Sequence, residues 1–274
     1  MAVPRAVPAL LILSLHVHPI IAIARGPKVS DWLVCVGLYL LSAFGLGVGL
    51  HRYFAHRSFQ TSRIFQFILC LLSGIAFGDP IWFAGKHRLH HKHSDTTLDV
   101  HSPAQGFWFC WFASIFEHGY SDEQILVRAR DLTQYPELMW IHRHYYVPPV
   151  VVALGTYVAG GYSMFAIGYC FGLLVALHAA SAINYCCHKG KNRRYHTRDH
   201  STNNFILGVL TFGEGWHNNH HHYPSTARAG FFWWELDGFY YVLKMLSWLG
   251  LVWDVREVPN RVKYDFTPTP NANS

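Results

Sequence analysis

The stretch WLVCVGLYLLSAFGLGVGLHRYFAH, residues 32–56, is an apolar run that ends in two histidines. Its first part, Trp32–Leu50, is apolar for about the 20 residues that a helix needs to cross a bilayer. His51 and His56 follow directly, so side chains able to bind a metal begin where the apolar run stops. The fold therefore depends on how many such runs the chain contains, and on which membrane face the histidines share.

The composition is that of an apolar chain with an excess of imidazole. Of its 274 residues, 51% are hydrophobic and 14% are charged, against roughly a quarter charged in soluble domains. The 20 histidines outnumber the 16 carboxylates. The six cysteines lie mostly in apolar runs without CxxC spacing, which argues against a disulfide framework. The positive charges alternate with histidines and apolar runs, so we expect no nucleic-acid partner.

Four apolar runs predict transmembrane helices, at residues 7–24, 32–50, 146–159 and 162–185. The first could instead be a signal peptide, so the sequence leaves open whether residues 1–24 are retained. A fifth run, Ile64–Phe83, lies between histidine clusters that a single crossing would separate. We therefore interpret it as an interfacial or protein-covered helix, interrupted at Gly78-Asp79-Pro80.

Two helical hairpins, the second turning at Gly160-Gly161, then leave the rest of the chain on one face. We expect one domain over residues 1–274: an all-α, multi-pass integral membrane protein with four transmembrane helices and a helical cap. The cap comprises residues 51–145 and 186–258, and a flexible tail follows at 259–274. Of the 22 lysines and arginines, 20 lie on the histidine face, which predicts that this face is cytoplasmic.

Two further apolar stretches lie on the cap side. Gly106–Phe116 is too short to cross a bilayer and is rich in the aromatic residues that favour membrane interfaces. Phe231–Trp253 is long enough, but its charged residues would be costly inside the membrane. We expect it to form an amphipathic helix in the plane of the membrane.

Three histidine clusters predict a metal centre. Two read HxxHH, and this spacing places three imidazoles on one face of a helix. The first pair is five residues apart and would point about 140° apart on a straight α-helix, so it should bracket a site from two directions rather than hold one ion from one face.

Eight histidines exceed what one ion needs, so we expect two metals. The candidate ligands are His51, His56, His87, His90, His91, His217, His220 and His221. Imidazole suits iron, copper or zinc, and iron fits an oxidative task in an apolar protein that has no serine nucleophile motif.

The motifs GLHRYFAHRSF, GKHRLHHKHSD, STNNF and GEGWHNNHHHYP resemble the membrane fatty-acid desaturases, specifically the acyl-CoA Δ9 (stearoyl-CoA-type) family in its short bacterial form. The resemblance runs from about Gly45 to Val255. It implies a di-iron site of nine histidines and a water-bridged asparagine. By resemblance, His188 is the ninth histidine and Asn184 the asparagine, one helical turn earlier.

The resemblance further implies an O2-dependent reaction that introduces a cis double bond, at the Δ9 position, into a saturated acyl chain carried on CoA. Its cofactors would be two Fe2+ ions, with O2 as co-substrate. Its surroundings would be membrane lipid, and its electrons would come from a separate ferredoxin, or from a b-type cytochrome with its reductase. From the residues alone, Asp95, Asp99 and Glu214 are candidates to accept imidazole N–H bonds, or else to serve as caps and surface ion pairs. Four cations could meet an anionic head group or lipid phosphates: Arg88, Lys92, Arg194 and Arg198.

Two other functions stay open at this point. A membrane hydroxylase of lipid or alkane substrates could use a similar histidine scaffold. A metal transporter or sensor is the non-enzyme alternative, although it would place ionisable residues along the spans rather than at their ends. The sequence leaves open the chain length, the double-bond position, the head group (CoA, carrier protein or lipid), the electron donor and the oligomeric state.

Overall fold

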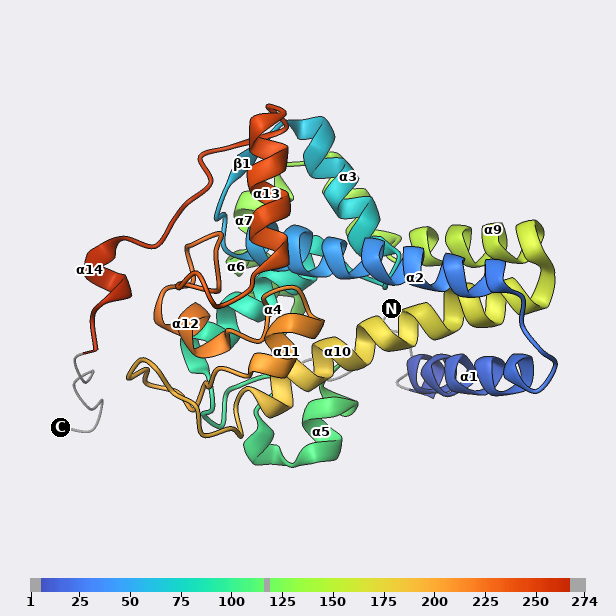
Figure 1. The fold of residues 1–274 in the computed structure, drawn as a ribbon, viewed down its shortest axis with the longest axis horizontal. Helices are drawn as coiled ribbons and strands as arrows, with labels where there is room; N and C mark the ends of the chain where they lie inside the picture. Colours follow the sequence, from blue (N-terminus) through green and yellow to red (C-terminus); the bar gives the residue numbers. More distant parts are fainter. Residues whose placement is uncertain (1–5, 116–118, 267–274) are drawn as a thin grey trace.

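The computed structural model describes residues 6–115 and 119–266. Four long helical segments lie side by side as an arm, and shorter helices form a cap at one end of it (Figure 1). The segments of the arm are α1 (Ala6–Ile23), α2 (Val29–Phe44) continued by η1 (Gly45–Ala55), α9 (Val147–Ser163), and η4 (Met164–Phe171) continued by α10 (Gly172–Cys186). The arm and the histidine-bearing cap are therefore distinct parts of the molecule.

Two helices of the described chain are long and apolar enough to cross a membrane, Val29–Ala55 and Val147–Cys186. The second is broken at Gly160 (φ −145°, ψ 15°) and Gly161 (φ 67°, ψ −161°). The chain reverses there, so α9 and α10 run antiparallel (Figure 1). The predicted hairpin is confirmed, and α1 covers the first predicted run, while the number of crossings stays a prediction.

The fifth apolar run is interrupted as predicted. It forms α3 (Arg63–Gly74) and α4 (Pro80–His93). The carboxylate of Asp79 accepts hydrogen bonds from the backbone N–H groups of Ile81 (2.9 Å) and Trp82 (3.1 Å), and Pro80 occupies the first helical turn. These are strong helix-start signals, so α4 begins anew at this point and changes direction.

The remaining cap elements are short. They are β1 (Gln60–Thr61), η2 (Pro103–Gln105), α5 (Phe107–Trp111), η3 (Ala113–Ile115), α6 (Asp122–Arg128), α7 (Arg130–Thr133), α8 (Pro136–Arg143), α11 (Phe205–Leu210), α12 (His217–His222), α13 (Gly238–Trp248), β2 (Val252–Trp253) and α14 (Asn260–Lys263). β1 and β2 pair antiparallel as the two-stranded sheet of the described chain. The expected interfacial stretch Gly106–Phe116 forms α5 and η3, and its last residue lies outside the described residues.

The expectation of one helix over Phe231–Trp253 is wrong. Only α13 within it is helical. The carboxylate of Asp237 is fully buried; it caps α13 by accepting from the backbone N–H of Tyr240 (3.0 Å) and also accepts from that of Ala229 (2.7 Å). The carboxylate thus joins the first turn of α13 to the backbone at Ala229, and the chain before it forms a loop.

The predicted flexible tail at 259–274 is also corrected in part. α14 forms at its start, and the carbonyl of Lys263 accepts a hydrogen bond from the hydroxyl of the buried Tyr195 (2.7 Å). This contact anchors α14 to the cap. Residues 267–274 lie outside the described residues.

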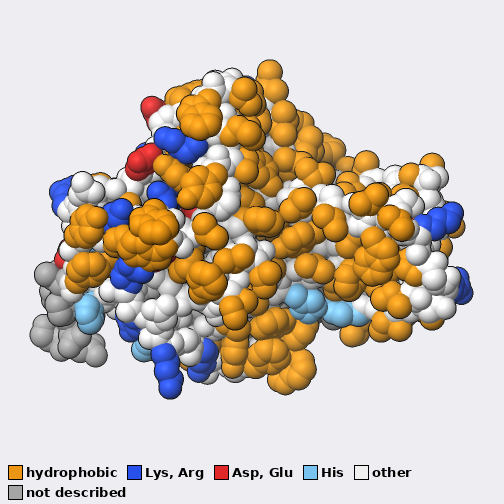
Figure 2. Space-filling model, viewed as in Figure 1, with side chains coloured by type: hydrophobic (Ala, Val, Ile, Leu, Met, Phe, Trp, Pro, Cys, Tyr) orange, Lys and Arg blue, Asp and Glu red, His pale blue; other side chains and the backbone are white. Residues whose placement is uncertain are grey.

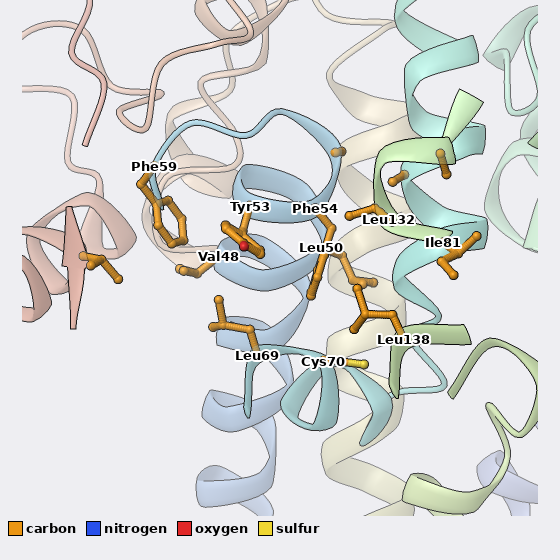
Figure 3. Close-up of a cluster of buried hydrophobic side chains, with 14 of the residues drawn as sticks. Val48, Leu50, Tyr53, Phe54, Phe59, Leu69, Cys70, Ile81, Leu132 and Leu138 are labelled. Atoms are coloured by element: carbon orange, nitrogen blue, oxygen red, sulfur yellow. The ribbon is translucent and has the colours of Figure 1, made fainter. Parts of the chain in front are cut away.

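The main hydrophobic core holds the cap end of η1. Val48, Leu50 and Phe54 point from η1 toward Leu69 of α3 and Ile81 of α4 (Figure 3). All five side chains are at most 1% exposed. Full burial of one such side chain stabilises a fold by about 1.5–3 kcal/mol, so the core fixes the position of the segment that carries His51 and His56.

The surface of the arm is apolar. Hydrophobic side chains cover most of the visible face, and lysines and arginines gather on the cap and at the far tip of the arm (Figure 2). Leu33 is 68% exposed and Val158 is 84% exposed. Exposed apolar area of this extent is typical of a surface that contacts lipid or a partner.

Histidines of the arm are used in packing. The Nε2 atoms of His16 in α1 and His178 in α10 are 3.0 Å apart. The indole N–H of Trp111 in α5 donates to Nδ1 of His178 (3.0 Å). This chain of polar contacts ties three elements together, so His178 is used in packing α10 against α1 and α5.

We expect Gly161→Ala to lower the free energy of unfolding by about 1–3 kcal/mol, because an L-residue is strained at φ 67°, ψ −161°. The control is Gly155→Ala in the same helix. Neither position has a neighbour within 4 Å of an added Cβ, so only the backbone conformation differs, and Gly155→Ala should be neutral or stabilising by up to about 1 kcal/mol. Chemical unfolding in detergent measures both. Equal effects would contradict the turn as described.

Candidate metal centre

Four segments bring nine histidines together in the cap. The end of η1 supplies His51, and His56 follows it; α4 supplies His87, His90 and His91; the end of α10 supplies His188; and α12 supplies His217, His220 and His221. The arm helices α2–η1 and α10 thus deliver ligands from their cap ends. The two HxxHH helices supply the rest.

The first histidine group consists of His51, His56, His87, His91 and His220, whose nearest ring nitrogens all lie within 4.8 Å of one another. The Nε2 atoms of His51 and His220 are 2.9 Å apart, as are those of His56 and His87. Two further Nε2 pairs, His91 with His87 (3.0 Å) and His91 with His220 (2.9 Å), close the group.

The second histidine group consists of His90, His188, His217 and His221, again with ring nitrogens within 4.8 Å of one another. Nε2 of His217 lies 3.0 Å from Nε2 of both His188 and His221. Three of the four residues are buried. Each group could hold a metal ion.

Each HxxHH helix divides its histidines between the two groups. In α4, the outer pair His87 and His91 joins the first group, and His90 between them joins the second. In α12 the assignment is reversed, because His217 and His221 join the second group and His220 joins the first. The spacing therefore divides the imidazoles between two adjacent groups, and the binding of two metals stays a prediction.

The straight α-helix assumed for the segment of His51 and His56 is corrected by the structure. Both imidazoles lie in the first group, with ring centroids 5.0 Å apart. The segment that carries them is a π-helix, and the backbone N–H of His56 donates to the carbonyl of His51 (3.2 Å). A five-residue hydrogen bond places residues i and i+5 one above the other, whereas the straight α-helix that we assumed separates them.

Carboxylates hold the outer nitrogens of four imidazoles. Nδ1 of His188 donates to Asp95 and Nδ1 of His90 donates to Asp99, both at 2.9 Å. Nδ1 of His51 donates to Glu214. These three carboxylates are the ones predicted from the sequence as imidazole partners.

Asp199 is a fourth carboxylate of this kind, which the sequence did not reveal. Its Oδ2 accepts from Nδ1 of His221 at 2.6 Å. It sits outside every histidine motif, so no spacing signal pointed to it. His101 was also missed as a neighbour of the site, although its ring lies 4.0 Å from that of His90.

Asn184 is half-buried on α10, one helical turn before His188. This is the spacing that the sequence suggested. Its proposed role toward a metal stays a prediction.

A buried arginine supports one of these carboxylates. Arg52 is 3% exposed and donates to Oε1 of Glu214 at 2.8 Å, while its other terminal nitrogen lies 3.0 Å from Asp237. Burial alone would raise the pKa of Glu214, but the charges of His51 and Arg52 outweigh it and lower the pKa to about 2. Glu214 is therefore ionised at neutral pH and can only accept hydrogen bonds.

Burial also keeps the imidazoles neutral. It lowers the pKa of His56, His87, His91, His217 and His220 well below 6.5, and neighbouring histidines lower these pKa values further. Burial lowers the pKa of His221 to about 4, although Asp199 acts in the opposite sense. Neutral imidazole is the form that binds a metal.

The arrangement fits bound cations. An ionised carboxylate cannot donate, so an imidazole bonded to it carries its proton on Nδ1 and a lone pair on Nε2. His221 thus presents a lone pair to Nε2 of His217, which lies at the same distance from Nε2 of His188. Nε2 of His90 is buried and has no hydrogen-bond partner among the described residues. Two nitrogens that each lie roughly 2.1 Å from one ion at right angles are about 3.0 Å apart, which matches the observed spacing.

Arg88, a sequence candidate for head-group binding, is engaged inside the cap. It donates to Asp131 (2.6 Å) and to the backbone carbonyls of Phe54 (2.8 Å) and Ala55 (2.9 Å). These contacts fix the end of η1 against α4 and α7. Arg88 therefore positions the segment that carries His56.

We expect His90→Ala to lower the metal content of the purified protein by about one ion per chain, because it removes one of four ligands of the second group. His93→Ala is the matched control: it lies on the same helix, three residues away, and its ring packs on Tyr120 rather than in either group. Elemental analysis by mass spectrometry measures both. Equal metal content in the two variants would contradict the assignment.

The metal-free protein should lose stability as the pH falls from about 6.5 toward 4. The pKa of His221 is about 4 in the folded chain and 6.5 unperturbed, so the unfolded chain binds more protons between these values. The other buried imidazoles act in the same direction. The hydrogen bond to Asp79 raises the pKa of His142, so this histidine acts in the opposite sense. Chemical unfolding from pH 7.5 to 4 measures the trend, and constant or rising stability on acidification would contradict it.

Comparison with known proteins agrees with this geometry. The sequence profile of the fatty acid desaturase family matches residues 30–252. The chain is 36% identical over 257 residues to an acyl-CoA C20 Delta5-desaturase of Anemone leveillei, covering 92% of this chain and 82% of that protein. It is 34% identical over 253 residues to an sn-1 stearoyl-lipid 9-desaturase of Anabaena variabilis, covering 90% and 92% of the two chains.

A third relative is Delta-9 acyl-lipid desaturase 1 of Arabidopsis thaliana, 34% identical over 226 residues, or 81% of this chain and 74% of the relative. The matched region contains every residue of both histidine groups. The chain belongs to the fatty acid desaturase family.

Proposed function

We propose that this protein is an O2-dependent fatty acyl desaturase that introduces a cis double bond into a saturated chain. The observation that carries the proposal is the convergence of nine imidazoles in two adjacent groups, within a chain of this family. Donor sets made of imidazole suit iron. A hydroxylase of similar construction is the outcome that the experiment below must exclude.

We further propose that each histidine group holds one iron, with Asn184 beside the second group. When bound, the two irons would supply the oxidising power to remove two hydrogens from an unactivated methylene pair, with O2 and externally supplied electrons. The ligands of this di-iron site would be His51, His56, His87, His90, His91, His188, His217, His220 and His221.

The contribution of the chain's own residues follows from their contacts. Asp95, Asp99, Asp199 and Glu214 hold Nδ1–H of their imidazoles and so fix the direction of each Nε2 lone pair. The ionised carboxylates also supply negative charge close to the imidazole ligands. Burial of the imidazoles excludes water from the site, which would protect a reactive centre from side reactions.

A groove of about 800 Å3 provides space for an acyl chain. It lies between α2, α10 and α11, and its apolar lining includes Leu174, Val175 and Leu207. Thr211 and Phe212 at its edge lie just before Glu214 in the chain. We propose that the saturated chain occupies this groove, with its reacting carbons directed toward the first histidine group.

The substrate proposal is a saturated acyl chain carried on CoA, desaturated at the Δ9 position. The name of the Anemone relative supports acyl-CoA, and the names of the Anabaena and Arabidopsis relatives support position 9. We also propose four membrane crossings, by α1, α2–η1, α9 and α10, with the cap on the cytoplasmic side. The apolar arm surface and the concentration of lysine and arginine outside the arm support this orientation.

Fatty-acid profiling of expressing cells tests the proposed function. Cells that express the wild type should contain a new monounsaturated acid, and cells that express His220→Ala should not, because His220 contributes to the first group. His93→Ala should keep the product. Fed deuterated stearate should lose two deuterium atoms and gain a double bond between carbons 9 and 10.

A hydroxy acid without an alkene would favour the hydroxylase, and equal profiles for wild type and His220→Ala would count against catalysis. Purified enzyme given stearoyl-CoA, stearoyl carrier protein or stearoyl-lipid vesicles then identifies the head group. Product from lipid vesicles alone would contradict the acyl-CoA proposal.

A further inference from the structure

An exposed basic segment, Lys189–His200, runs directly from the second histidine group to the cap surface. Lys189, Lys191, Arg193 and Arg198 are exposed, and Asp199 is its one carboxylate. Lysines and arginines gather on this end of the molecule in the space-filling view (Figure 2). The segment therefore presents a positive surface next to the proposed metal centre.

Three of these cations are not used inside the protein. Lys189, Lys191 and Arg198 have no carboxylate within ion-pair distance among the described residues. Arg194, by contrast, pairs with the buried Glu235 at 2.6 Å. Unpaired exposed charge of one sign produces a field that extends into solvent and attracts opposite charge.

The same segment makes hydrogen bonds to imidazole-bonded carboxylates. Asp199 accepts from Nδ1 of His221 (2.6 Å). The backbone N–H of the exposed His200 donates to Oδ2 of Asp95 (2.7 Å), and the same oxygen accepts from Nδ1 of His188 (2.9 Å). Two hydrogen bonds thus join the surface backbone to an imidazole of the second group.

The other two carboxylates that bond imidazoles, Asp99 and Glu214, do not link these imidazoles to the basic segment. The side chain of Asp99 is completely buried. Glu214 is enclosed by Arg52, which is itself 3% exposed. Among the carboxylates of the described chain that bond these imidazoles, only Asp95 and Asp199 contact the basic segment.

We propose that the segment Lys189–His200 is the docking surface for a small acidic electron-carrier protein, whose electrons enter through the second histidine group. The inference rests on the proposed function, because desaturation consumes two electrons from outside. The balance is R–CH2–CH2–R′ + O2 + 2 e− + 2 H+ → R–CH=CH–R′ + 2 H2O. Two molecules of a one-electron carrier are oxidised in each turnover, and the protons come from solvent.

The test compares the metal-loaded wild type with a variant in which Lys189, Lys191 and Arg198 are replaced by Gln. The control variant replaces Arg128, Arg130 and Arg143 by Gln, which are equally exposed cations of the cap on α6, α7 and α8 and lack a carboxylate partner among the described residues. The probes are an acidic [2Fe–2S] ferredoxin and an acidic b-type cytochrome domain. Calorimetry measures their Kd at low and high ionic strength, and metal content and thermal unfolding verify that each variant is folded.

We expect at least one carrier to bind the wild type. The Kd of that carrier for the Lys189/Lys191/Arg198 variant should be about tenfold higher than for the wild type at low salt. The difference between the two Kd values should shrink at high salt. The KM for that carrier should rise while kcat and the KM for the acyl substrate hold. An unchanged Kd, an equal effect of the control variant, or a higher KM for the acyl substrate instead would each overturn the proposal.

A chemical reductant separates this inference from the proposed function. Dithionite-reduced wild type and variant should form the same amount of alkene when O2 and acyl substrate are added, because no carrier has to dock. If the wild type forms no alkene with any reductant, the proposed function fails, and the binding data alone decide on the docking surface. If alkene forms but the wild type and the Lys189/Lys191/Arg198 variant bind the carrier with the same Kd, only the proposed docking surface is refuted.

Discussion

The direction of the imidazole lone pairs is the constraint on which the structure depends. Four carboxylates hold Nδ1–H on the outside, so the Nε2 atoms of these imidazoles point inward, where they lie about 3 Å from the Nε2 atoms of neighbouring histidines, a spacing that suits ligands of one cation. Everything else in the cap serves to keep these groups in place. The buried Arg52 compensates Glu214 and Asp237, and the apolar core immobilises η1.

The arm and the cap are stabilised by different kinds of interaction. The arm exposes apolar side chains and satisfies its backbone within long helices, which suits a lipid environment. The cap is made of short elements joined by polar side chains such as Asp79 and Asp237, which cap helices and bond to other elements at the same time.

The sequence predicted much of this, for identifiable reasons. Hydrophobic run length located the arm helices, and Gly160-Gly161 located the reversal. The HxxHH spacing predicted two metal sites. It did not predict the π-helix that carries His51, because a π-helix differs from an α-helix by hydrogen bonds that depend on tertiary packing. Asp199 was missed because it reaches His221 through a loop, and the helix predicted over Phe231–Trp253 failed because buried backbone amides of the loop bind Asp237.

The exchange of middle histidines between α4 and α12 has a mechanical consequence. A rotation of α4 about its axis would withdraw His87 and His91 from one group and His90 from the other at once, and α12 behaves in the same way. Rotation of either helix would therefore disturb both groups together. Each of the two helices thus contributes ligands to both groups. The relative position of the two groups is therefore set by the fixed rise and turn of a helix rather than by flexible side chains.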